Sequence, residues 1–152
     1  MIGVGNPLRG DDGAGRAVAR LLAGRPALSH ARSAIPSLVV LESSGEATSL
    51  LEAWAGFDDV VLVDACRGAG PPGSIHVFSA DEADRIASLR HASSHSLGVA
   101  AAIGLARALG TLPARLLVHA VEARNTTEGD RLSPEVDVAV RRLAALLAAG
   151  SR

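Results

Sequence analysis

The chain begins with the stretch Ile2-Gly-Val-Gly-Asn-Pro-Leu-Arg-Gly-Asp-Asp-Gly-Ala-Gly15. Its first residues are apolar and predict a strand over residues 1–4, and the spacing of apolar side chains after the glycines predicts a helix over residues 13–24. The glycines between them permit turns with positive φ and close approach of neighbouring backbone. Asp11 and Asp12 therefore lie where a strand turns into a helix, which is where open α/β sheets bind ligands.

The rest of the chain alternates predicted strands and helices. Apolar runs predict strands over residues 38–41, 60–63, 75–78 and 116–121, and amphipathic spacing predicts helices over 46–55, 95–109 and from 133 onward, with a short helical turn near 81–88. This order predicts an α/β fold, a three-layer doubly wound sandwich with about five mostly parallel strands and helices on both faces. The alternating pattern of residues 75–78 places that strand at an edge of the sheet. We expect residues 1–152 to form a single domain.

Composition excludes several classes of function. The hydrophobic fraction is 48%, but no apolar run approaches the roughly 18 residues that a membrane span requires. The fifteen basic residues are scattered and the formal net charge is −1, so we expect no nucleic-acid surface. The single cysteine, Cys66, excludes an internal disulfide framework and a zinc site built from cysteines. The first residues lack a signal-peptide pattern and the helical faces demand no second copy, so we expect a cytoplasmic monomer.

Four side chains are candidates for a site at the carboxyl ends of the predicted strands. Asp12 follows the first strand, Asp64 ends the third, Glu122 ends the last, and His95 precedes a predicted helix. Carboxylates and an imidazole together suit a divalent metal such as nickel, zinc or cobalt. The same groups are also suited to acid–base chemistry. If the carboxylates lie close together, their repulsion raises the pKa of one of them unless a cation neutralises the pair.

Two familiar site types fit the sequence poorly. A dinucleotide-binding turn has a third glycine at the position that Leu8 occupies, and two carboxylates beside it would repel a phosphate. A serine hydrolase of the α/β type is also poorly supported, because the chain contains no Gly-x-Ser-x-Gly elbow. Neither class therefore explains the first motif.

Each candidate also has a purely structural interpretation. Asp11 or Asp12 would stabilise the following helix as an N-terminal cap. Asp64 directly follows buried apolar residues, where an acid must be paired or used. His119 lies inside a predicted strand and fits a packed core position better than a ligand, and Cys66 fits an inert buried thiol. These alternatives remain open at this stage.

Taken together, the motifs resemble those of the hydrogenase maturation protease family, nearly from end to end. The resemblance rests on the motifs Gly3 to Gly15, Val61-Leu-Val-Asp-Ala65, Gly70-Pro-Pro-Gly73, Ser94-His-Ser-Leu-Gly98, Glu122 and Leu132-Ser-Pro-Glu-Val136. The later motifs are weak individually, but their order and spacing after the long first motif make the resemblance specific.

The resemblance implies a function and a site. Members of this family are nickel-dependent endopeptidases that remove a C-terminal extension from the large subunit of nickel-iron hydrogenases once nickel has been inserted. It implies a doubly wound fold and a metal site of Asp12, Asp64 and His95, with nickel borne by the substrate and a hydrogenase large-subunit precursor as the partner. Asp11 is then expected to cap the helix or support Asp12. Two alternatives are a non-proteolytic nickel-binding accessory protein of the same fold and a small-molecule metal-dependent hydrolase.

Overall fold

The computed structural model describes residues 1–24, 38–91 and 96–150. In this part of the chain six strands form one sheet, in the order β2-β1-β3-β6-β4, with β5 pairing to β3 beyond this path. The strands are β1 (Ile2–Val4), β2 (Leu41–Ser43), β3 (Asp59–Arg67), β4 (Ile75–Ser79), β5 (Arg90–His91) and β6 (Arg115–Glu122). Strands β2, β1, β3 and β6 are mutually parallel, and β4 and β5 run antiparallel to their neighbours.

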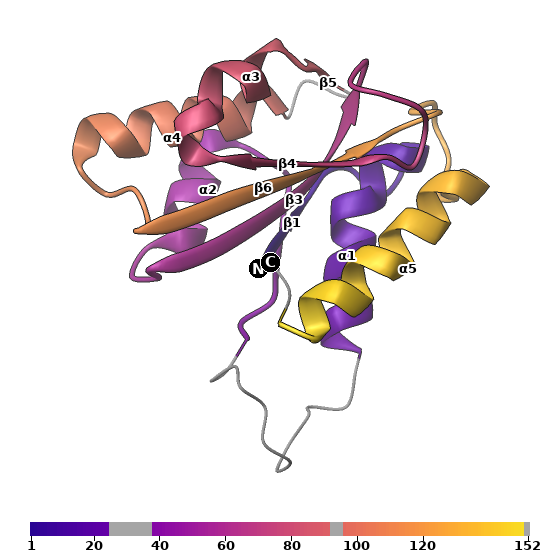
Figure 1. The fold of residues 1–152 in the computed structure, drawn as a ribbon, viewed down its shortest axis with the longest axis horizontal. Helices are drawn as coiled ribbons and strands as arrows, with labels where there is room; N and C mark the ends of the chain where they lie inside the picture. Colours follow the sequence, from indigo (N-terminus) through magenta and orange to yellow (C-terminus); the bar gives the residue numbers. More distant parts are fainter. Residues whose placement is uncertain (25–37, 92–95, 151–152) are drawn as a thin grey trace.

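Helices cover both faces of this sheet, so that the protein has three layers (Figure 1). One face carries α1 and α5, and the other carries α2, α3 and α4. The helices are α1 (Ala14–Ala23), α2 (Ala47–Trp54), α3 (Ala83–Ser88), α4 (Ser96–Leu109) and α5 (Pro134–Ala148), with short 3-10 turns η1 (Gly10–Gly13) and η2 (Ala80–Glu82) before α1 and α3. None of the helices in the described residues is long and apolar enough to cross a membrane.

Strand β3 divides the hydrophobic core into two. Its side chains alternate between the faces: Leu62 packs in the core under α2 and α4, and Val63 packs in the core under α1 and α5. Both side chains are fully buried. This explains the uniformly apolar run in the sequence, because a strand covered on both faces has no solvent side.

The glycines of the first motif allow α1 to lie directly against the sheet. A Cβ atom on Gly15 would come 2.1 Å from the carbonyl oxygen of Val63 and 2.4 Å from that of Val4. Gly5, with a φ of 128°, brings its backbone against Asp12, whose carbonyl oxygen would be 1.8 Å from an added Cβ. The protein's own backbone therefore fills the space beside these glycines.

A second close backbone contact fixes the start of α4. A Cβ atom on Gly98 would lie 1.7 Å from the carbonyl oxygen of Gly45, in the loop after β2. This contact explains the glycine in the Ser94-His-Ser-Leu-Gly98 motif. It joins the start of α4 to the loop at the carboxyl end of β2.

The predicted fold is confirmed, with three local differences. Strand β4 is at the sheet edge as expected, but β2 occupies residues 41–43 rather than 38–41. A short sixth strand, β5, was not predicted. Strand β3 does not end at Asp64, because it continues to pair with β6 as far as Cys66 and Glu122. Asp64 therefore lies within a strand and takes the orientation that strand alternation gives it.

The contact at Gly98 predicts opposite effects for two glycines of one helix. Gly98→Ala should lower the free energy of unfolding by about 3 kcal/mol, because backbone must move to admit the methyl group. Gly104→Ala should raise it by up to about 1 kcal/mol, because nothing lies within 4 Å of the added Cβ and alanine favours the helix. Urea denaturation measures both. Equal effects of the two substitutions would contradict the packing described at Gly98.

Candidate active site

Asp12 lies in the η1 turn between β1 and α1. Its side chain is only 1% exposed, and its Oδ2 accepts a hydrogen bond of 3.0 Å from the backbone N–H of Asn6. Neither Asp12 nor Asp11 caps a helix at this point: the residues at the cap positions are Arg9 and Gly13, and neither makes a side-chain cap hydrogen bond. The expectation that one of the two aspartates caps the first helix is therefore wrong.

Asn6 holds this loop together, a role that was not predicted from the sequence. Its backbone N–H binds Asp12, and its side-chain Oδ1 accepts a hydrogen bond of 2.9 Å from the N–H of Leu8. An Asn-Pro pair is a known turn signal, and this pair could have indicated the compact loop. The loop folds back on itself, so that a residue of the same motif, Asn6, binds the carboxylate of Asp12.

Asp64 points from β3 toward the layer formed by α2 and α4. It follows the alternation of Leu62 and Cys66, which both belong to the core on that face. Its Oδ1 accepts a hydrogen bond of 2.8 Å from the backbone N–H of Ala65. Burial raises the pKa of Asp64 to about 7, although the hydrogen bond from Ala65 favours the charged carboxylate. The negative charge of Asp12 adds to the rise. The two carboxylates are thus close enough to interact electrostatically.

His95, the third predicted metal ligand, lies outside the described residues. Helix α4 begins at the next residue, Ser96, and Val99 in its first turns lines a small cavity of about 10 Å³ together with Asp64. Within the described residues no cluster of three His, Cys, Asp or Glu side chains could hold a metal ion. The structure therefore brings together Asp12, Asp64 and the start of α4, and the assignment of His95 stays a prediction.

Glu122, the fourth candidate, holds the turn that follows β3. Its carboxylate accepts hydrogen bonds from the backbone N–H groups of Gly68 at 2.6 Å and Ala69 at 2.9 Å, and from the thiol of Cys66 at 3.4 Å. Burial and the adjacent Glu122 charge raise the pKa of Cys66 far above its usual value, so the thiol is not a nucleophile. Both residues have structural roles, as expected for Cys66.

Asp11 anchors the loop between β6 and α5. Its fully buried carboxylate accepts four hydrogen bonds: from the backbone N–H groups of Arg124 at 2.9 Å, Asn125 at 2.8 Å and Ser133 at 2.6 Å, and from the Ser133 hydroxyl at 2.8 Å. Asp11 therefore connects the first motif to the segment before the last helix. Its neighbour Asp12 is positioned by this connection.

Comparison with known proteins identifies the family. The profile of the family HycI, hydrogenase maturation protease, matches residues 26–149. The chain belongs to the hydrogenase maturation protease family. The family assignment made from the sequence motifs is confirmed. A search of curated proteins found no significant match.

Solved structures of maturation proteases share the fold. The NiFe hydrogenase maturation protease HybD from Thermococcus kodakarensis superposes with a TM-score of 0.74 at 23% identity, covering 99% of this chain and 97% of that one. The hydrogenase maturating endopeptidase HybD from E. coli gives a TM-score of 0.74 at 24% identity, with 98% and 91% covered. An endopeptidase from Escherichia coli solved in solution gives 0.79 at 24% identity, with 97% and 88% covered. At these identities the comparison confirms the architecture.

The hydrogen bonds of Asp11 predict a large loss of stability when its side chain is removed. Asp11→Ala removes the acceptor of four partly buried hydrogen bonds, three of them from backbone N–H groups, and should lower the free energy of unfolding by roughly 3–5 kcal/mol. Asp81→Ala, at a side chain that is 95% exposed, should change it by less than about 0.5 kcal/mol. Thermal and urea denaturation compare the two. A wild-type melting temperature for Asp11→Ala would exclude the anchoring role.

The raised pKa of Asp64 predicts a pH-dependent gain of stability for Asp64→Asn. In the folded protein the proton is held up to about pH 7, whereas the unfolded chain releases it near 3.8, so wild-type stability falls as the pH rises between these values. The asparagine removes that loss. The advantage of Asp64→Asn should be near zero below pH 4 and reach up to roughly 4 kcal/mol at pH 8.

Urea denaturation across this pH range measures the difference. Asp58→Asn, at an exposed position, serves as the control for the substitution itself. An advantage of Asp64→Asn that does not change with pH would contradict the shifted titration of Asp64.

Proposed function

We propose that this protein is an endopeptidase that removes the C-terminal extension of a nickel-iron hydrogenase large-subunit precursor after nickel has been inserted. The observation that carries the proposal is the buried pair of interacting carboxylates, Asp12 and Asp64, in a chain of the maturation protease family. The solved relatives with this fold are maturation proteases by name.

The chemistry of the pair favours a cation in the bound state. Among the described residues each carboxylate uses one oxygen to accept a backbone N–H and keeps the other free of hydrogen bonds. Two such oxygens and the imidazole of His95 form a donor set that suits nickel, which accepts oxygen and nitrogen ligands. Nickel carried by the precursor would neutralise the pair, and we propose that Asp12, Asp64 and His95 bind it.

A site of this kind recognises its substrate by the metal that the substrate carries. Three protein ligands leave positions open for groups of the precursor, and the protein alone should hold little nickel. A bound metal ion can polarise a carbonyl or lower the pKa of water. In the metal-free protein the pKa of Asp64 is raised to about 7, so binding of nickel near neutral pH would release its proton.

The test is a cleavage assay with the purified protein and a nickel-loaded precursor. We expect the precursor to shorten on a denaturing gel, and nickel-free precursor to remain intact. Asp12→Ala and His95→Ala should reduce the cleavage rate at least about 100-fold, because each removes a group that acts at the reacting centre. Asp81→Ala, far out in solvent, should cleave normally.

The assay also separates the alternatives. A non-proteolytic accessory protein would bind the nickel-loaded precursor without shortening it. A small-molecule hydrolase would leave the precursor intact and retain metal through purification, which elemental analysis detects. Intact precursor under these conditions would reject the protease function.

A further inference from the structure

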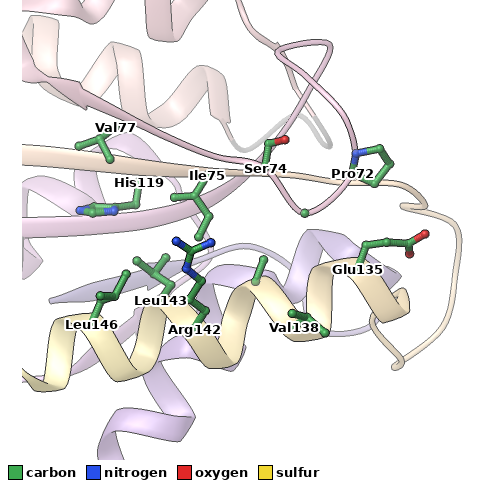
Figure 2. A pocket seen from close by; sticks show the side chains of 12 residues that line it. Pro72, Ser74, Ile75, Val77, His119, Glu135, Val138, Arg142, Leu143 and Leu146 are labelled. Carbon is green, nitrogen blue, oxygen red and sulfur yellow. The ribbon is translucent and has the colours of Figure 1, made fainter.

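A groove of about 670 Å³ lies between β4 and α5, away from the two aspartates. Figure 2 shows the strand side formed by Ile75, Val77 and His119, and the helix side formed by Val138, Arg142 and Leu146. Strand β4 is the last strand in the sheet order, and α5 packs on α1 and β6. The outer part of this sheet face is therefore left open beside an edge strand.

The walls of the groove are apolar side chains that remain exposed. Val77 is 50% exposed, Val138 67% and Leu146 43%, and all three border the same groove. Scattered exposed apolar residues are ordinary, but several around one concave surface indicate a binding site. The volume falls in the range of ligand pockets, which is about 300–1,000 Å³.

His119 gives this groove an unusual polar group. Only 5% of His119 is exposed, and neither ring nitrogen has a hydrogen-bond partner in the described part of the chain. Burial lowers the pKa of His119, so the ring is neutral near pH 7 and offers one donor and one acceptor. An unpaired buried polar group costs roughly 1–3 kcal/mol. The N–H or C=O of a bound peptide backbone would supply a partner for one of the ring nitrogens.

Arg142 supplies a positive charge to the same groove. Its guanidinium points from α5 across the groove toward Ile75 (Figure 2). Nearby charges are already paired: Arg141 binds Asp137, and Glu135 at the end of the groove binds Arg124. Among the described residues Arg142 has no ion-pair partner, so a carboxylate on the bound molecule would complement it.

We propose that the groove between β4 and α5 binds an extended peptide segment of a protein partner, with apolar side chains against Val77, Val138 and Leu146, a backbone amide at His119 and a carboxylate at Arg142. A peptide satisfies all three features at once, whereas a simple aliphatic acid whose carboxylate binds Arg142 has no polar group left for His119. The binding does not depend on the cleavage proposed above. It is a second surface, separate from Asp12 and Asp64.

The test uses a random octapeptide library displayed on phage and selected on the immobilised full-length protein. We expect enriched peptides to combine apolar residues with one Asp or Glu. A fluorescein-labelled synthetic copy of an enriched peptide should lose at least tenfold in affinity with Arg142→Gln and with His119→Leu, measured by fluorescence polarisation. Arg141→Gln, whose side chain pairs with Asp137, should bind as the wild type does.

Two further measurements make the result specific. Replacing the acidic residue of the peptide by its amide should weaken binding to the wild type but not to Arg142→Gln, which shows that the two groups contact each other. His119→Leu should melt no lower than the wild type, because no hydrogen bond is lost in the free protein. A lower melting temperature would mean that water already satisfies the ring, and would count against the proposal.

Three outcomes would overturn the inference. In the first, the library yields no enriched peptides. In the second, the enriched peptides bind Arg142→Gln and His119→Leu as tightly as they bind the wild type. In the third outcome, octanoate displaces the labelled peptide and binds with equal affinity, which would assign the groove to small aliphatic acids.

Discussion

The arrangement of the loops at the carboxyl end of the parallel strands depends on the buried carboxylate of Asp11. It accepts four hydrogen bonds from a segment more than a hundred residues away, and so joins the loop after β1 to the loop before α5. Without this acceptor, three partly buried backbone N–H groups would lose their hydrogen-bond partner. Glu122 does the same for the turn after β3. Two buried acids thus hold the loops that follow β1, β3 and β6.

Neighbouring acids in this protein have opposite environments. Asp11 accepts four hydrogen bonds, whereas Asp64 accepts one and lies in an apolar layer next to another carboxylate. Such differences separate structural acids from acids that are poised to bind a cation or exchange a proton. Asp11 and Asp12 are adjacent in the first motif, yet Asp11 binds the distant segment before α5 and Asp12 binds the N–H of Asn6 within the motif.

The sequence predicted the layers of the fold because each layer has a local signal. The apolar run before Asp64 indicated a strand covered on both faces, and the alternation around Val77 indicated an edge strand; both are confirmed. The partners of Asp11 and Glu122 had no such signal, because they are backbone groups distant in sequence. Likewise, His119 was recognised as a core residue, but its missing hydrogen bonds follow only from what packs around it. Position in the chain therefore predicted which acids lie at the carboxyl ends of the strands. The hydrogen-bond partners of each acid depend on tertiary contacts, which the sequence does not indicate.

The alternation of β3 between two cores has a consequence for how the protein tolerates change. Leu62 and Val63 are neighbours in sequence but belong to separate clusters of buried side chains, because the sheet separates the core under α2 and α4 from the core under α1 and α5. Substitutions in separate cores combine nearly additively, since neither alters the surroundings of the other. Each layer can thus accumulate changes independently, while the carboxylate-bearing loops at the sheet end stay in place. Relatives at about one-quarter identity can retain this architecture by such a route.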